Sequence, residues 1–171
     1  MHATPADFFR TYAVMIRLIT REFRLEEWAI ADLPQDDQAL IQAAHDACKG
    51  AYAPYSSFQV GSAVRLASGE IIQGSNQENM AYPSGLCAER VAFFAAGAQH
   101  PDEQIVAAAV VTNSAMDLVN FSPCGGCRQV MLETEIRQDA PIRFLMQTGS
   151  SHVGVSPHVR QFLPLTFKFP K

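Results

Sequence analysis

The sequence lacks any apolar run close to the roughly 20 residues that a membrane-spanning helix requires. Its N-terminus also lacks the basic stretch followed by an apolar stretch that marks a secretory signal peptide. We therefore expect a cytoplasmic protein whose cysteines stay reduced. An excess of positive charge is missing too, because 13 Lys and Arg stand against 17 Asp and Glu, for a net charge of −4. This balance disfavours tight binding to a nucleic-acid backbone and favours a small neutral substrate.

With 171 residues, of which 48% are hydrophobic, the chain is suited to one domain of ordinary size. No internal repeat or linker divides it. We expect a single domain over residues 31–171, preceded by an N-terminal extension over residues 1–30. Within the extension, residues 16–25 partly alternate between apolar and polar, which fits an edge strand as well as a helix. The sequence indicates no role for residues 1–20.

The order of elements predicts the fold class. Apolar periodicity, glycines and prolines predict three helices and a short final one, over about 35–51, 87–97, 124–137 and 157–162. Strands are expected over 58–66, 70–74, 104–112 and 142–146, the third apolar enough to be covered on both faces. This order predicts an α/β fold, a three-layer α/β/α sandwich on a mixed sheet. Val91, Phe94 and Ala95 are expected on the buried face of the second helix.

Three of the four cysteines form a metal-binding pattern. Cys124 and Cys127 have the C-x-x-C spacing with which two thiolates hold one ion, and Cys87 is available as a third ligand. Three thiolates leave the fourth position of a tetrahedral zinc open, which is typical of a catalytic zinc. All three cysteines are expected near helix N-termini, where the helix dipole lowers the pKa of a thiol.

A closed structural zinc site is the alternative, and it needs a fourth ligand. Cys48 is the spare cysteine, but it falls on the apolar face of the first predicted helix, where a small core residue is expected. His45, His100 and His152 lack the paired spacing of metal ligands. The catalytic interpretation is therefore favoured.

Glu89 and Arg90 follow the first cysteine directly. Glu89 is close enough to the metal to move protons to and from a bound water, although glutamate is also common in the first turn of a helix. Zinc with three thiolates carries a formal charge of −1. Arg90 is expected to offset this charge by hydrogen bonds to the ligand sulfurs, unless it is simply solvated.

Together, Cys87, Glu89 and the segment Pro123–Cys127 resemble the zinc deaminases, in particular the small homotetrameric cytidine deaminases. The resemblance implies one Zn²⁺ per subunit and hydrolytic deamination of cytidine and 2′-deoxycytidine to uridine and 2′-deoxyuridine, with release of ammonia, in pyrimidine salvage. In the implied mechanism, Glu89 takes a proton from the water on zinc, and the hydroxide attacks C4 of the base. Glu89 then passes protons to N3 and to the departing amine.

The same resemblance implies substrate-binding residues. Phe58, in an F-x-V-G segment, would pack by the sugar and base, and Asn76 and Glu78, in an N-x-E-N segment, would bind the ribose 3′-hydroxyl. The other implied contacts are the backbone near Ala88 and Ser122, Tyr82, and Phe167 reaching a neighbouring subunit's base. The alternatives without a role in binding are a core position for Phe58 and Phe167, a turn position for Asn76 and a surface charge for Glu78. The chain departs from the family pattern at Pro83–Gly85 and at Gln161, where glutamate is common.

Three rival functions remain open. A deaminase of modified nucleosides would differ in the loop around Pro83 and in the C-terminal segment. A nucleic-acid editing deaminase is disfavoured by the negative charge and by Glu78, which would repel a 3′ phosphate. A non-catalytic protein stabilised by zinc would lose nothing measurable when Glu89 is replaced by alanine.

Overall fold

The computed structural model describes residues 17–149 and 151–167. Residues 1–16 of the expected N-terminal extension lie outside this description. Among the described residues, no helix is both long enough and apolar enough to cross a bilayer.

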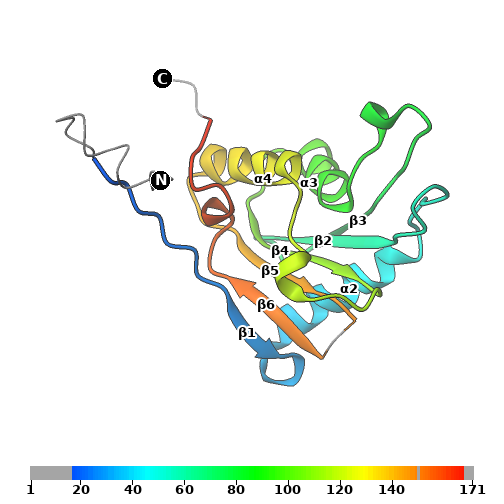
Figure 1. Ribbon diagram of the computed structural model, residues 1–171, viewed down its shortest axis with the longest axis horizontal. Helices are drawn as coiled ribbons and strands as arrows, with labels where there is room; N and C mark the ends of the chain where they lie inside the picture. The colour runs from blue at the N-terminus through cyan, green and yellow to red at the C-terminus, as the bar shows by residue number, and fades with distance from the viewer. Residues whose placement is uncertain (1–16, 150, 168–171) are drawn as a thin grey trace, which may run out of the picture.

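The middle layer is a mixed sheet (Figure 1). Within the described ranges it has six strands, in the spatial order β1-β6-β5-β4-β2-β3. Neighbouring strands pair antiparallel except for β4 and β5, which are parallel. The strands are β1 (Glu26–Ala29), β2 (Val60–Leu66), β3 (Ile71–Ser75), β4 (Ile105–Thr112), β5 (Arg143–Gln147) and β6 (His152–Ser156).

Helices cover both faces of this sheet. Helix α2 (Gln35–Cys48) packs on one face, and α3 (Ala88–Gln99) and α4 (Gly125–Gln138) lie side by side on the other (Figure 1). Short 3₁₀ turns complete the connections: η1 (Ile30–Asp32), η2 (Tyr82–Ser84), η3 (Leu118–Asn120) and η4 (Val159–Phe162). The predicted three-layer α/β/α sandwich is therefore confirmed.

The central strand β4 divides its apolar side chains between two cores, because successive residues of a strand point to opposite faces. Ala107, Ala109 and Val111 face the core under α2, and Ala108 and Val110 face the core under α3 and α4. Both faces are thus buried, as the apolar run 104–112 predicted.

Two glycines let the helices approach the sheet closely. A Cβ atom at Gly61 would lie 1.9 Å from the Ala44 carbonyl oxygen of α2, and one at Gly74 would lie 2.4 Å from the Ala92 amide nitrogen of α3. The contact at Gly74 brings the first turns of α3 down onto β3. It therefore helps to fix how far the N-terminus of α3, where the site described below lies, stands from the sheet.

The N-terminal and C-terminal strands were poorly predicted. Residues 17–25, expected to be a strand or a helix, have neither structure, and the strand β1 begins only at Glu26. Strand β6 was missed altogether. Its sequence, His-Val-Gly-Val-Ser, is short and polar at both ends, and it is a strand because β5 and β1 pair with it on either side.

The predicted buried face of α3 was wrong for Phe94, whereas Ala95 is partly buried against the core. The residues buried beneath this helix include Ala88, Ala92, Phe93 and Ala96, whereas Phe94 is 49% exposed. Apolar residues occur all round α3, so periodicity alone did not identify the packed side. Ala88 and Ala92 lie where the helix approaches β3 closely at Gly74, which favours small side chains at these two positions.

Candidate metal centre and active site

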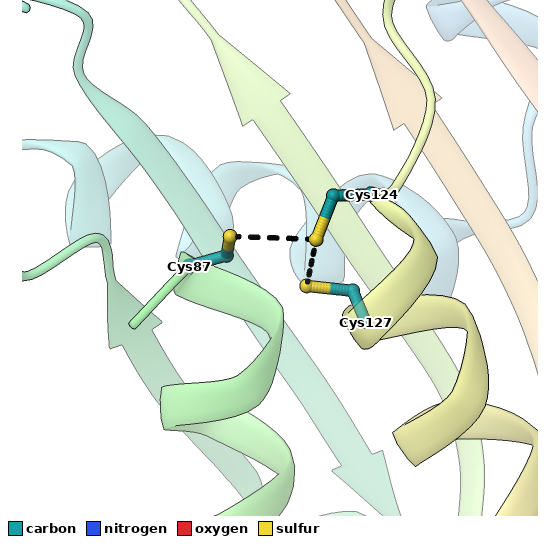
Figure 2. A group of neighbouring side chains, drawn as sticks. All are labelled: Cys87, Cys124 and Cys127. Atoms are coloured by element: carbon teal, nitrogen blue, oxygen red, sulfur yellow. Dashed lines mark hydrogen bonds between the residues drawn. The ribbon is translucent and has the colours of Figure 1, made fainter. Parts of the chain in front are cut away.

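Three cysteine side chains meet where two helices begin (Figure 2). Cys87 is the N-cap of α3, Cys124 is the N-cap of α4, and Cys127 lies in the first turn of α4. The Sγ atoms of Cys87 and Cys124 are 3.7 Å apart, and those of Cys124 and Cys127 are 3.4 Å apart. We call these three residues the cysteine cluster.

The geometry of the cysteine cluster fits one zinc ion. The three sulfur atoms lie within 4.8 Å of one another. Thiolates at the usual zinc–sulfur distance of about 2.3 Å, in a tetrahedral arrangement, are about 3.8 Å apart. Free backbone N–H groups and the positive ends of two helix dipoles also favour negative charge here. Among the described residues, the possible ligands here are these three sulfur atoms, which leave one tetrahedral position for a water or a substrate.

The three thiols influence one another's pKa values. A hydrogen bond from Cys127 is the main cause that lowers the pKa of Cys87 to about 5, with further help from Cys124 and Arg90. The pKa of Cys127 is raised, because its proton is held by Cys87 and its side chain is buried. Cys87 is therefore a thiolate at neutral pH, ready to bind a cation.

Glu89 lies beside the cluster and is only 5% exposed. Burial raises the pKa of its carboxyl to about 7, and the negative charge of Cys87 acts in the same direction. In this environment the group can both take up and release a proton near neutral pH, as a general acid–base residue must.

Arg90 links the cluster to the preceding loop. Its guanidinium hydrogen-bonds Cys87, and its Nη2 donates to the carbonyl oxygen of Gly85 at 3.1 Å. The positive charge thus lies next to a ligand sulfur, where it opposes the excess negative charge of a zinc with three thiolates.

Among the predicted substrate-binding residues, Asn76 is connected to the segment that carries Phe58. Asn76 is buried, and its side chain bonds the strand backbone on both sides: Oδ1 accepts from the Val60 N–H and Nδ2 donates to the Phe58 carbonyl, each at 2.9 Å. Phe58 is half-buried and packs edge-on against Phe121, with ring centroids 6.5 Å apart. The structure therefore gives Asn76 a scaffolding contact to the segment that carries Phe58.

Glu78 is half-buried and is held by the loop before Phe58. Its carboxylate accepts hydrogen bonds from the Tyr55 N–H at 2.9 Å, the Ser56 N–H at 3.3 Å and the Ser56 hydroxyl. The Ser56 hydroxyl is the main cause that lowers the pKa of Glu78. Ser56 Oγ also accepts from the Phe58 N–H at 3.0 Å, so one serine connects two predicted substrate-binding residues. Sequence reasoning missed Ser56, because a serine in a loop carries no signal of its own.

Ala88, Tyr82 and Phe167 differ in their surroundings. Ala88 is fully buried at the start of α3, whereas Tyr82, on η2, is 80% exposed. Phe167 is 68% exposed, at the end of the described C-terminal segment. The two exposed rings are accessible to a substrate or to a second subunit.

Arg128, which sequence reasoning missed, holds the loop before Cys124. Its Nε donates to the Pro123 carbonyl at 2.6 Å, and its Nη2 donates to Ser122 Oγ at 2.7 Å. An arginine in the first turn of a helix is disfavoured by the helix dipole. Its position directly after Cys127 was therefore the signal that could have identified it.

Two other groups of possible ligands have structural explanations. Cys48 is buried, and its thiol donates to the Val111 carbonyl at 3.6 Å, which confirms the expected core position. His100 lies with Glu70 and Glu103 in a second set of possible metal ligands, each carboxylate 3.5 Å from a ring nitrogen. Sequence spacing missed this set because Glu70 comes from a separate hairpin. Attraction between the imidazole and the carboxylates accounts for it without an ion.

Comparisons with known proteins agree with this geometry. Residues 34–139 match the family model described as the cytidine and deoxycytidylate deaminase zinc-binding region. A cytidine deaminase of Halalkalibacterium halodurans is 46% identical over 98 residues, which cover 57% of this chain and 71% of that protein. A cytidine deaminase of Mycobacterium tuberculosis is 37% identical over 115 residues, which cover 65% of this chain and 84% of that protein.

Solved structures show the same likeness. The cytidine deaminase of Burkholderia pseudomallei superposes with a TM-score of 0.66 at 37% identity, over 75% of this chain and 97% of that one. The cytidine deaminase of M. tuberculosis has a TM-score of 0.60 at 30% identity, over 80% of this chain and 100% of that one. The similarity thus extends over nearly the whole of both solved chains.

Proposed function

This chain belongs to the cytidine and deoxycytidylate deaminase family, and we propose that it hydrolyses cytidine and 2′-deoxycytidine to uridine and 2′-deoxyuridine with release of ammonia. The observation that carries the proposal is the position of Glu89. A buried carboxylate with a pKa of about 7 lies beside three converging cysteines that leave one metal position free. A purely structural zinc site has no need of such a group.

Cys87, Cys124 and Cys127 would hold the Zn²⁺, one per subunit, at the two helix N-termini. When bound, zinc supplies a Lewis acid that makes water nucleophilic at neutral pH. Arg90 would reduce the excess negative charge of the thiolates through its hydrogen bond to Cys87, so that this acidity is preserved.

Glu89 would carry the protons of the reaction. Deamination adds water at C4 of the base and expels the 4-amino group. Both protons of the water must therefore leave its oxygen, one for N3 and one for the departing amine. A single carboxyl that titrates near neutral pH can serve each transfer in turn. Burial excludes bulk water from this carboxyl and strengthens its hydrogen bonds to the reacting atoms.

Substrate binding would use groups on either side of the cluster. The backbone near Ala88 and Ser122 would hydrogen-bond the base, and Phe58 would pack against the base and sugar. Glu78 would accept from the ribose 3′-hydroxyl, assisted by the remaining amide hydrogen of Asn76. Because the Glu78 carboxylate stays charged, it favours a free nucleoside over a 3′-phosphorylated one.

The assembly proposed here is a homotetramer with a shared site. In it, Tyr82 and Phe167 would complete the site, with Phe167 reaching a neighbouring subunit's base; their exposure supports this role. The deaminase domain would span residues 31–171, behind an extension over 1–30. Because its substrates are free nucleosides, the enzyme would act in pyrimidine salvage, in the cytoplasm.

Ammonia release from cytidine by the zinc-loaded protein tests the proposal. We expect uridine and ammonia in equal amounts, and weaker turnover of cytidine 3′-monophosphate. Absence of ammonia from cytidine and from 2′-deoxycytidine, with one zinc per chain, would contradict it. Sedimentation that shows a fully active monomer would contradict the shared site alone.

A further inference from the structure

The side chain of Gln161 binds the backbone of a residue far away in the sequence. Its Oε1 accepts a hydrogen bond from the Arg24 N–H at 2.9 Å, and its Nε2 donates to the Arg24 carbonyl at 2.8 Å. Both polar groups of one backbone residue are therefore satisfied by one amide, as in a hydrogen-bonded pair of antiparallel strands. A glutamate could not make both bonds, because an ionised carboxylate only accepts.

Residues on either side of Arg24 are also anchored. The Phe23 ring packs edge-on against Phe162, with centroids 5.2 Å apart, and Phe162 packs in turn on Phe144 of β5. Leu25 lies over Gly154 of β6, where a Cβ atom would come within 3.2 Å of the leucine side chain. We call residues 21–25 the strap; it has no regular secondary structure and is held by these side-chain contacts.

The surface that receives the strap is fixed independently of it. The buried carboxylate of Glu135 accepts from the backbone N–H groups of Val159 and Ile142, at 3.0 and 3.1 Å, and pairs with Arg160 at 3.2 Å. Arg128 Nη1 donates to the Phe162 carbonyl at 3.3 Å. The turn η4 is thus tied to α4, and through Arg128 to the loop before Cys124.

The strap faces the C-terminal segment across a groove of about 1030 Å³. Arg21, Phe23 and Leu25 line one part of the groove, and residues 163–166 line another. The strap therefore bounds the space into which the chain continues after η4. It lies outside residues 34–139, the part that matches the family model.

We propose that Gln161 is a positioning residue: its amide docks the strap, and the docked strap directs residues 163–167, and with them Phe167, toward the active site of a neighbouring subunit. This inference rests on the proposed function, because it assigns the strap a role in substrate binding at a shared site. Gln161 touches no reacting atom. Replacement of Gln161 should therefore change the KM for the nucleoside and leave the proton transfers at Glu89 unchanged.

Limited digestion with trypsin tests the docking without any assay of activity. The bond after Arg24 is protected by Gln161, whereas the bond after Arg17 lies outside the strap and serves as an internal reference. In zinc-loaded Gln161→Glu and Gln161→Ala, we expect the rate of cleavage at Arg24 relative to Arg17 to rise by about two- to tenfold for each hydrogen bond lost. Gln73→Glu makes the same chemical change at an exposed position on β3, the opposite edge of the sheet, and should leave the ratio unchanged. An unchanged ratio in both Gln161 variants would overturn the docking.

Steady-state kinetics with cytidine tests the consequence. We expect Gln161→Glu and Gln161→Ala to raise KM about three- to tenfold while kcat stays within about twofold, with zinc content and melting temperature as in the wild type. If cleavage at Arg24 accelerates but KM does not change, the positioning role is overturned. If the wild type itself does not deaminate cytidine, the proposed function fails, and the positioning role fails with it. The trypsin ratio then still decides whether Gln161 docks the strap.

Discussion

The two faces of the sheet each carry a set of charged or ionisable side chains that is at least partly buried, and the two sets differ in how the charge is balanced. Under α2, Asp37 is 2% exposed and lies 2.8 Å from Arg143 Nε and 3.5 Å from Arg65 Nη2. We call these three residues the Asp37 cluster. Under α3 and α4, the cysteine cluster and Glu89 gather several potential negative charges around the positive charge of Arg90.

Because of this difference, we expect the Asp37 cluster to serve stability and the cysteine cluster to serve function. The Asp37 cluster contains its own counter-charges, so removing one partner leaves a charge uncompensated within the fold. The cysteine cluster is complete only with an added cation, and its carboxyl responds by a raised pKa. Buried charge that the chain does not balance is thus the mark of the site, and the predictions below test this contrast.

Glu89→Gln should give the largest effect. Turnover of cytidine by the zinc-loaded variant is expected to fall about 10²- to 10⁴-fold, because the proton carrier is lost. Its melting temperature should stay equal to that of the wild type or rise, because a neutral amide replaces a carboxyl whose charge is unfavourable there. Glu133→Gln, at an exposed position on α4, is the matched control. Turnover by Glu89→Gln within about tenfold of wild type would contradict the assignment.

Asp37→Asn should show the opposite profile. We expect the free energy of unfolding to fall by about 3 kcal/mol, because Arg65 and Arg143 lose their counter-charge. The kcat of the folded fraction should stay unchanged. Urea denaturation measures the loss, and Asp36→Asn, at the exposed neighbouring position, should change stability little. Equal denaturation midpoints for the two variants would mean that the Asp37 cluster does not stabilise the fold.

After removal of the metal, the cysteines on the two faces of the sheet should differ in reactivity. After treatment with a chelator, the protein should lose activity, and Cys87 should react with iodoacetamide at pH 7 at least about tenfold faster than Cys48. The pKa of Cys87 is lowered to about 5, so it is a thiolate at this pH. Burial raises the pKa of Cys48, which stays a protonated thiol. Peptide mapping gives both rates, and zinc should protect Cys87 but not alter Cys48. Equal rates would remove this distinction between the faces.

Ser56→Ala should have the smallest effect, since Glu78 is a half-buried carboxylate held by neutral donors. Loss of the Ser56 hydroxyl should raise the KM for cytidine about three- to fivefold, because Glu78 and Phe58 lose a common anchor. The KM for 3′-deoxycytidine, which lacks the group that Glu78 would bind, should change less. Ser68→Ala, in the β2–β3 hairpin, is the control. A rise of equal size for both substrates would argue against the link through Glu78.

The metal motif was predictable because its main relations are local. Cys124 and Cys127 lie at the N-cap and in the first turn of one helix, so their spacing in sequence determines their proximity. Glu89 follows Cys87 within the first turn of α3 for the same reason. Apolar runs bounded by glycine and proline likewise identified the buried strands β2, β4 and β5, and with them the order of elements that defines the sandwich.

The sequence by itself therefore determined the ligand types, the candidate proton carrier and the fold class. Only the tertiary structure decided that Cys87 meets Cys124, 37 positions away, because α3 and α4 pack side by side on one face. It also decided which side of α3 is buried, that residues 152–156 form a strand, and that Gln161 binds Arg24 across 137 positions. These contacts depend on side chains brought together by packing. Hydrophobic periodicity shows that a face of an element will be buried, but it does not identify the element on which that face packs.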